Sequence, residues 1–556
     1  MKTHTLGALV ATGFLILAQG AFGADAPITF TGFFADPNPN WAGMRDEVGQ
    51  YITEKTGVTL KADFPVGSAD QKIALIAASG QYPDFISPKG QAASLIDSGA
   101  LLDLTKLIDQ YAPHIKAVLG DQIKRLRFST KDKSIYFIPN LDAIGQIYFD
   151  TDAWFKLQLG ALREQGFPKI ETIQDYEKVI ATYLKKHPTT ADGQPTIGLS
   201  LLADDWRIVI STTNPAFWAT GAPDDGEYFI DPKTFKAKEH YFRPEEKVYF
   251  RWLNHMNDIG LLDKESFIQK YDQYKAKIAQ GRVVGLIDAN WEISDAIKSL
   301  LAAGQFDKIY GRFGVVTKKG IKPAYNQLTG FNGGWGIAVT KDCKDPVRAI
   351  KFLDWLAAPE NQVLINWGIE GKHWTMVNGK RTFTAATLAA MKADPNGFQK
   401  KTGLGATGLA NSSTGSGGNY NISLRYGDGV KDTSGNFYTT NFPEQILESY
   451  TPMEREAMKA YKTTFWNDLL PKASEFPVKA WGAGWSIQVA EDSILKQFWD
   501  KEQAVVRKRI PEAILAKPAD FDKLYDAFLV ELDATTGAMA EAESQLVQDR
   551  IALWTR

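Results

Sequence analysis

The sequence predicts an α/β fold built as two lobes, and three observations support this prediction. Short apolar runs alternate with helical patterns from Ile28 onward, which is typical of sheets covered by helices. The opening runs follow a strand–helix–strand–helix–strand order, which predicts a parallel sheet with ligand sites at the carboxyl ends of its strands. At 556 residues the chain exceeds the size of a single core, so we expect it to divide.

The first lobe should open with three strands, each a short run rich in β-branched and aromatic residues. The expected strands are residues 28–34, 58–64 and 84–87. Amphipathic helices follow the first two strands, one ending near Thr56 and one over residues 71–78. The polar loop at residues 36–40 follows the first strand, where it would face a ligand.

The rest of the chain continues the alternation of strands and helices. Residues 153–186 read as largely helical, and residues 346–357 show apolar positions at helical spacing. Residues 403–436 are rich in Gly, Ser, Thr and Asn, which predicts a long irregular loop, and the last hundred residues read as helical. The further expected strands are residues 134–139, 146–150, 285–288, 310–316 and 334–339. More than one crossing of the chain should join the lobes.

The first residues have the pattern of a secretory signal peptide. Lys2 and His4 precede an uncharged run, and Ala21 and Gly23 supply the small residues of a cleavage site before Ala24. The apolar run is shorter than the roughly 20 residues that span a bilayer, and Ala24 offers no cysteine for a lipid anchor. We therefore expect residues 1–23 to be removed and the mature protein to be periplasmic, soluble and not lipid-anchored.

Composition narrows the class of protein. Cys343 is the single cysteine, so no disulfide can form within the chain, and stability must come from core burial. The net charge of −2 favours neither nucleic acid nor an anionic membrane surface as a partner. The chain carries no metal-protease, hydrolase-elbow or phosphate-loop motif, and only six histidines. These features favour binding over catalysis.

Tryptophan is the most informative residue type, with 15 copies in the chain. An aromatic face can stack on the C–H face of a sugar ring, while neighbouring polar side chains bond its hydroxyl groups. Five tryptophans lie in helical patterns and are expected to pack in cores: Trp154, Trp252, Trp355, Trp499 and Trp554. Eight lie in loop-like or strand-end contexts beside small or polar residues: Trp41, Trp206, Trp218, Trp291, Trp335, Trp374, Trp481 and Trp485. This second set predicts a sugar-binding cleft.

The order of several short motifs resembles that of extracellular solute-binding proteins of ABC importers. The segments that carry the resemblance are residues 51–58, 78–84, 99–104, 138–139, 147–148, 285–291, 343–356, 359–360, 368–371, 510–514 and 548–551. Residues 285–291 resemble the apolar strand followed by a polar residue and Trp in maltose-binding-type proteins. Residues 343–371 narrow the resemblance to the large subgroup that includes alginate-binding periplasmic proteins and LplA-like lipoproteins.

This resemblance implies the periplasmic binding protein fold. Two α/β lobes would be joined by a multi-strand hinge, hold the ligand between them, and deliver it to the transmembrane permease subunits of an ABC importer. The implied N-terminal lobe covers residues 24–147 and is completed by about 311–357. The implied C-terminal lobe covers residues 148–310 and is completed by about 358–556. We expect a monomer.

The resemblance also carries roles onto particular residues. Trp291 would stack on sugar, Glu370, His373 and Trp374 would lie near the cleft, and the first lobe would contribute Asn38, Asn40 and Trp41. Alginate binders carry an acidic calcium loop, whereas residues 187–194 here hold one carboxylate. We therefore expect no metal and no cofactor, and the sequence disfavours a structural calcium ion.

The leading hypothesis is capture of an oligosaccharide by lobe closure, without catalysis. The candidate ligand-binding residues are Asn38, Asn40, Trp41, Lys89, Asp142, Trp206, Trp218, Asp288, Trp291, Phe331, Asn332, Trp335, Glu370, His373, Trp374 and Arg425. Because Lys89 and Arg425 are positively charged, a sugar that contains uronic acid remains a candidate ligand. Two alternatives stand beside this hypothesis: an exported polysaccharide-active enzyme, since 65 acidic residues give many carboxylate pairs, and a binding protein for a peptide or an organic acid.

Overall fold

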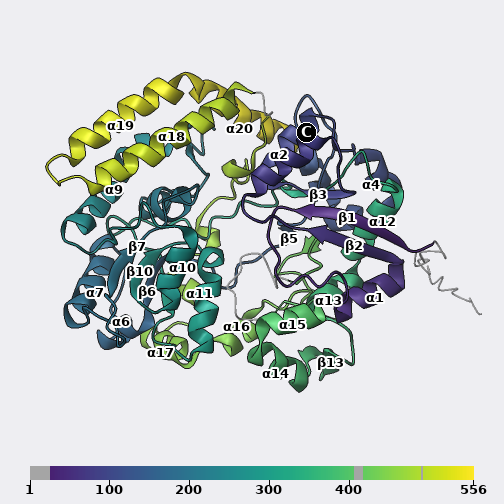
Figure 1. The fold of residues 1–556 in the computed structure, drawn as a ribbon, viewed down its shortest axis with the longest axis horizontal. Coiled ribbons are helices and arrows are strands. Elements are labelled where there is room, and N and C mark those ends of the chain that lie inside the picture. The colour runs from purple at the N-terminus through teal and green to yellow at the C-terminus, as the bar shows by residue number, and fades with distance from the viewer. Residues whose placement is uncertain (1–25, 406–417, 490–492, 556) are drawn as a thin grey trace, which may run out of the picture.

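A computed structural model describes residues 26–405, 418–489 and 493–555 of the chain. Two lobes lie side by side, each with its own sheet, and three long helices near the C-terminus arch over one side of the molecule (Figure 1). The expected signal peptide and part of the expected loop at residues 403–436 lie outside the described residues. Over the described ranges, the helices are all too short or too polar to cross a membrane.

The first lobe is built on a five-stranded sheet in the order β2-β1-β3-β12-β4. β1 pairs in parallel with both β2 and β3, so the predicted parallel start of the sheet is confirmed. β12 runs antiparallel to β3 and β4. The strands are β1 (Ile28–Phe34), β2 (Val58–Asp63), β3 (Phe85–Ser87), β4 (Ile138–Pro139) and β12 (Gly336–Val339). Its longer helices are α1 (Glu47–Thr56), α2 (Ala69–Ser79), α4 (Thr105–Tyr111), α5 (Pro113–Leu119) and α12 (Pro346–Ala357).

The second lobe is built on a four-stranded sheet in the order β11-β6-β10-β7. β10 is parallel to β7 and antiparallel to β6. The strands are β6 (Phe155–Gln158), β7 (Ile197–Ser200), β10 (Val283–Ile287) and β11 (Tyr310–Phe313). Helices α7 (Ile173–Lys186), α9 (Pro244–Asp258), α10 (Tyr271–Ala279) and α11 (Asn290–Ala302) belong to this lobe. The largely helical interpretation of residues 153–186 was wrong at β6, whose four residues are all buried inside the sheet.

Shorter elements complete the structure. The helices are α3 (Ala92–Asp97), α6 (Leu159–Glu164), α8 (Pro215–Ala219), α13 (Pro359–Trp367), α14 (Ala385–Ala393), α15 (Pro395–Thr402), α16 (Pro443–Ser449) and α17 (Pro452–Tyr461). The strands are β5 (Ala143–Ile144), β8 (Tyr228–Ile230), β9 (Ala237–Glu239), β13 (Trp374–Val377), β14 (Lys380–Phe383) and β15 (Arg425–Tyr426). The strand expected at residues 146–150 did not form, and β5 pairs instead with β15 just before it.

The two hydrophobic cores divide the chain differently from the expected lobe boundaries. β11 pairs with β6, so residues 310–313 belong to the second sheet. The core of the first lobe includes Trp367, Phe383 and Leu424, beyond the expected limit at about 357. The second core resumes only at Ile446 and runs on to Leu532. The chain therefore crosses between lobes after β5, again after β11, and again before α16.

The C-terminal helices connect the lobes. Helix α18 (Ile494–Leu515) packs against α19 (Phe521–Thr536) and on α9 of the second lobe. Helix α20 (Ala540–Thr555) touches both lobes: Ser544 Oγ accepts a 3.0 Å hydrogen bond from the Ala237 amide of β9. At its other end, the guanidinium of Arg125 from the first lobe lies 4.4 Å from the ring centre of Trp554. α20 is thus a strap across the join.

Three glutamates are buried where α18 and α20 meet the β8–β9 hairpin: Glu239, Glu502 and Glu543. Burial raises the pKa of Glu502 well above its usual value, and the carboxylate of Glu227 raises it further. Burial also raises the pKa of Glu543 to about 8, with Glu239 as a second cause. The folded protein therefore keeps protons that the unfolded chain releases near pH 4.3.

This cluster predicts that stability falls as the pH rises. Carboxyl groups with raised pKa values stabilise the fold below their unfolded pKa and lose that contribution as the pH passes the folded value, here about 8 for Glu543. Glu502→Gln should raise the melting temperature at pH 8.5 by at least ~2 °C and change it little at pH 5. Glu541→Gln, an exposed position on α20, serves as the control. An equal effect of Glu502→Gln at both pH values would contradict this prediction.

Candidate functional site

Three tryptophans are exposed, and they lie on different segments of the chain. Trp206, Trp291 and Trp485 have 45%, 46% and 49% of their surface exposed. Large aromatic side chains are normally buried, so grouped exposed indoles mark a binding surface. Each belongs to the set that the sequence predicted for a sugar cleft, although Trp485 was not among the chosen site residues.

Trp291 owes its position to the end of strand β10. The strand ends at Ile287, and α11 begins at Asn290, so the indole stands on the first turn of a helix. The Asn290 amide donates to the Asp152 carboxylate. The negative charge is favourable here because the start of a helix carries a partial positive charge. Buried Lys156 neutralises this carboxylate over 2.8 Å and also donates to the Asp288 carbonyl oxygen.

Trp206 lies parallel to Trp291, with ring centres 6.1 Å apart and 11° between the planes. Arg207 holds the pair together: its guanidinium lies 4.8 Å from the ring centre of Trp206. The same guanidinium donates two 3.0 Å hydrogen bonds to the buried carboxylate of Glu292, the residue that follows Trp291 on α11. Burial raises the pKa of Glu292, and Arg207 opposes that shift.

A second aromatic pair joins Trp335, next to the sheet of the first lobe, to Trp485 of the C-terminal quarter. Trp335 precedes β12, and its ring centre lies 5.0 Å from that of Trp485 in the short 3₁₀ turn Gly484–Ser486. The ammonium of Lys89 lies 5.7 Å from the Trp335 ring centre and pairs with Asp36. Trp335 and Trp485 are therefore in contact although they lie far apart in the sequence.

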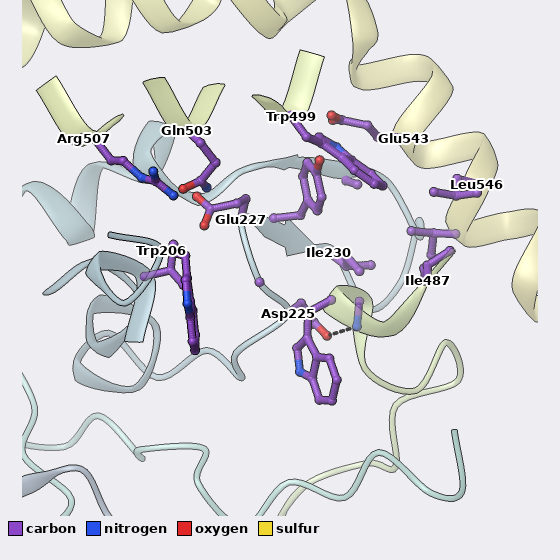
Figure 2. A pocket seen from close by; sticks show the side chains of 17 residues that line it. Trp206, Asp225, Glu227, Ile230, Ile487, Trp499, Gln503, Arg507, Glu543 and Leu546 are labelled. Atoms are coloured by element: carbon purple, nitrogen blue, oxygen red, sulfur yellow. Dashed lines mark hydrogen bonds between the residues drawn. The ribbon is translucent and has the colours of Figure 1, made fainter. Parts of the chain in front are cut away.

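A cavity of about 310 Å³ is lined by Trp206 and Trp485, and its other lining residues come from the second lobe and the C-terminal segments. The cavity falls within the ~300–1,000 Å³ range of small-molecule sites. Figure 2 shows Trp206 at its edge, with Glu227, Gln503 and Arg507 gathered on one side. The full lining is Trp206, Val209, Asp225, Gly226, Glu227, Tyr228, Ile230, Ala237, Gly484, Trp485, Ile487, Trp499, Gln503, Arg507, Glu543, Leu546 and Val547.

Buried hydrogen bonds hold the Trp485 segment in place. The Asp225 carboxylate accepts from Lys479 Nζ at 2.7 Å, Trp481 Nε1 at 3.0 Å and the Gly484 amide at 3.0 Å. Arg550 of α20 donates to the Ala483 carbonyl at 3.1 Å. A buried carboxylate with several donors is strongly constrained, so the segment is fixed relative to the second lobe.

Four predicted aromatic site residues pack in the cores. Trp218 is buried between Trp154 and Tyr325, with ring centres 4.3 and 4.5 Å away. Trp374 and Phe331 are buried in the core of the first lobe. Trp41 packs partly on the same core, against Phe64 and Tyr420. Their rings are occupied by protein contacts.

Polar site residues from the first lobe mostly bond to the protein. Asn38 Nδ2 donates to Asn419 Oδ1 at 3.0 Å, and Asn40 Nδ2 donates to Gln399 Oε1 at 3.0 Å. His373 is buried and bonded to Glu47 at 2.7 Å, and burial lowers its pKa. Glu370 is exposed beside the β13–β14 hairpin.

The remaining predicted residues support the backbone around the cavity. Asp142 accepts from the amides of Asn332 and Gly333 at 3.0 and 3.2 Å, and Asn332 Oδ1 accepts from the Ala483 amide at 2.7 Å. Asp288 is buried below α11, and its Oδ1 accepts from the Ala289 amide at 2.7 Å. Arg425 is buried and donates to the Leu141 carbonyl at 3.1 Å.

The structure adds cavity residues that the sequence did not single out. Glu227 lies before β8, and Trp499, Gln503, Arg507 and Glu543 come from α18 and α20. The sequence signal for these cavity residues was weak. Helix α18 carries polar residues, Glu502 among them, on a face that should be apolar for packing. Trp499, which was assigned to a core, lines the cavity half-buried.

Metal ligation has no obvious place among the residues described. Among these residues, no three or more His, Cys, Asp or Glu side chains are arranged to hold an ion. The stretch at residues 187–194 forms a tight turn, in which the Thr190 amide donates to the Gln194 carbonyl at 2.8 Å. Our expectation that calcium is disfavoured stays a prediction.

Two α/β lobes joined by several crossings of the chain are the architecture expected of a solute-binding protein. The family model described as bacterial extracellular solute-binding protein matches residues 48–366, more than half of the chain. The chain belongs to this family, as its motifs predicted.

Curated relatives match part of the chain. The fructooligosaccharide ABC transporter substrate-binding protein FusA of Streptococcus pneumoniae is 23% identical over 343 residues, which cover 58% of this chain and 59% of FusA. Lipoprotein LipO of Bacillus subtilis is 23% identical over 346 residues, which cover 59% of this chain and 64% of LipO. The chain thus matches less than two thirds of the length of either relative.

Solved structures resemble the whole fold. The alginate-binding protein AlgQ2, solved without calcium, aligns over 97% of this chain and 100% of its own, with a TM-score of 0.58 and 17% identity. A solute-binding protein from Bifidobacterium longum infantis, described as HMO-binding and ABC-transporter-associated, aligns over 96% and 100%, with a TM-score of 0.64 and 14% identity. At these identities the likeness shows the fold, and it confirms the predicted two-lobed α/β class.

The Arg207–Glu292 pair predicts a stability test. Arg207→Met leaves the buried Glu292 carboxylate without its partner and should lower the free energy of unfolding by about 3 kcal/mol. The double variant Arg207→Met/Glu292→Gln removes the unpaired charge and should recover part of that loss. Urea denaturation of both variants measures the difference, and a double variant that is less stable than the single one would refute the ion-pair explanation.

Proposed function

We propose that this protein captures an oligosaccharide between its lobes and delivers it to the permease of an ABC importer. The observation that carries the proposal is a group of exposed indoles from three separate segments: Trp206 and Trp485 line one cavity, and Trp291 stacks beside Trp206. Indoles offer flat apolar faces for sugar rings, and Gln503 and Glu227 offer amide and carboxylate groups for hydroxyls.

Lobe closure supplies the mechanism of capture. Trp291 stands on the second lobe and Trp335 on the first, so a ligand that touches both gains its full contacts only when the lobes come together. A ligand shifts an open–closed equilibrium through this difference in affinity. The crossings of the chain between β5 and α16 form the hinge in this proposal.

Membership of the extracellular solute-binding family supports export and an importer partner. FusA is described as part of a fructooligosaccharide ABC transporter, and the likeness to it supports a sugar ligand. LipO is described as a lipoprotein, whereas Ala24 leaves this chain without the cysteine for such an anchor at the expected cleavage site. We propose a periplasmic, unanchored monomer without enzymatic activity or cofactor.

An enzyme and a binding protein make different predictions for the same incubation. Mixed with neutral and acidic oligosaccharides, a binding protein changes its tryptophan fluorescence and leaves the sugars intact. Shorter products, seen by chromatography, would contradict the proposal and favour a polysaccharide-active enzyme.

The exposed indoles predict a loss of sugar binding on substitution. Trp291→Ala and Trp485→Ala should each weaken binding of a responsive oligosaccharide tenfold or more, if each stacking contact contributes about 1–3 kcal/mol, as base–aromatic stacking does. Isothermal titration calorimetry measures the affinity. Both side chains are half exposed, so the melting temperatures should stay close to that of the wild type.

Trp355→Phe on α12 is the matched control, because Trp355 packs against the core of the first lobe rather than facing the cavity. It should leave the affinity unchanged. Unchanged affinity in Trp291→Ala and Trp485→Ala would remove the stacking role.

A further inference from the structure

We infer that the cavity between Trp206 and Trp485 selects a neutral sugar residue and rejects a uronate. The inference rests on the proposed function and names the class of oligosaccharide that the site takes. Four features support it. The cations beside the site are already paired, and the cavity lining is acidic. A uronate would add a further negative charge at a cost in free energy, whereas groups that can bond sugar hydroxyls lie in the cavity wall.

The cationic side chains around the site are bonded to protein groups. Lys89 pairs with Asp36, and Arg207 pairs with Asp205 at 2.5 Å and with Glu292 at 3.0 Å. An arginine that binds a ligand carboxylate offers two nitrogens side by side. Arg207 already engages its Nε with Glu292 and its Nη1 with Asp205.

Arg425, which with Lys89 was considered for a uronate, and Lys479 are also engaged with protein groups. Arg425 is buried, donates to the Leu141 carbonyl, and faces the negative charges of Asp428 and Asp142. Lys479 is buried against Asp225 at 2.7 Å. Neither is positioned to meet a carboxylate that enters the cavity.

The cavity wall itself is acidic. Glu227 and Asp225 line it, together with Glu543, which keeps its proton at pH 7 because its pKa is raised to about 8. Arg507 is the one cationic residue in this described lining. In Figure 2, Arg507 and Gln503 extend from α18 toward the Glu227 carboxylate. The positive charge of Arg507 opposes the rise that burial causes in the pKa of Glu227. His240, Tyr241 and Gln503 oppose the same rise more strongly, so Arg507 offsets part of the negative charge of Glu227.

A uronate carboxylate in this cavity would lose water and lie near Glu227 and Asp225. Both effects are unfavourable, because a charge that leaves water needs a partner of opposite sign. A sugar hydroxyl meets the opposite situation, since it donates to Glu227 and accepts from Gln503 or Arg507. Polar groups that suit one ligand and penalise another are the usual source of specificity.

The first test compares matched ligands. Calorimetry at pH 7 should show that neutral oligosaccharides of two to five units bind at least tenfold more tightly than uronate oligomers of the same length. If uronates bind equally well or better, the selectivity inference fails while sugar capture stands. If neither class binds, the proposed function fails.

The second test converts the selectivity. Glu227→Gln removes the charge that Arg507 partly offsets but keeps an acceptor for the Tyr241 hydroxyl, which donates to Glu227 at 2.9 Å. The variant should bind uronate oligomers at least tenfold more tightly than the wild type, and its melting curve reports folding. Glu541→Gln, exposed on α20, should leave both affinities unchanged. An unchanged preference in folded Glu227→Gln would overturn the role assigned to this charge pair.

Discussion

The buried carboxylate of Asp225 is the contact on which the arrangement of the site depends. It joins a loop of the second lobe to the segment at residues 479–486 by accepting three hydrogen bonds, one from the buried Lys479 ammonium. Removing either charge would leave the other without a partner in a medium where isolated charges are costly. Because this segment carries Trp485, the pair also fixes one wall of the cavity.

Around that anchor, structural and recognition roles fall to different side chains. Hydrogen bonds to backbone groups engage the side chains of Asp142, Asn332 and Arg550. These bonds hold together the loop before β12 and the loop around Trp485. The indoles of Trp206 and Trp291 stay partly exposed and free to stack on a ligand. A rigid polar frame with apolar faces directed into a cavity is what preorganised binding requires.

Local patterns predicted much of the fold, and long-range packing explains what they missed. β1 and α12 appear as predicted because strand alternation and helical spacing are properties of consecutive residues. β6 was missed because Lys156 interrupts its apolar run, and one group that satisfies Lys156, the Asp288 carbonyl, lies far along the chain. For the site, polar context identified a set of tryptophans but could not separate exposed Trp291 from buried Trp218. Glu227 and Arg507 line the same cavity only because α18 folds back onto the second lobe.

The interleaving of the two cores has a consequence for how the chain folds. The first core joins Phe30 to Leu424, and the second joins Phe155 to Leu532, so neither can be completed from a contiguous stretch. Contacts between residues so distant in sequence require loop closure before they stabilise anything, which slows folding. A chain that ends before residue 424 would leave both cores exposed to solvent and prone to aggregation. Folding of this protein is therefore a late event, decided by its last quarter.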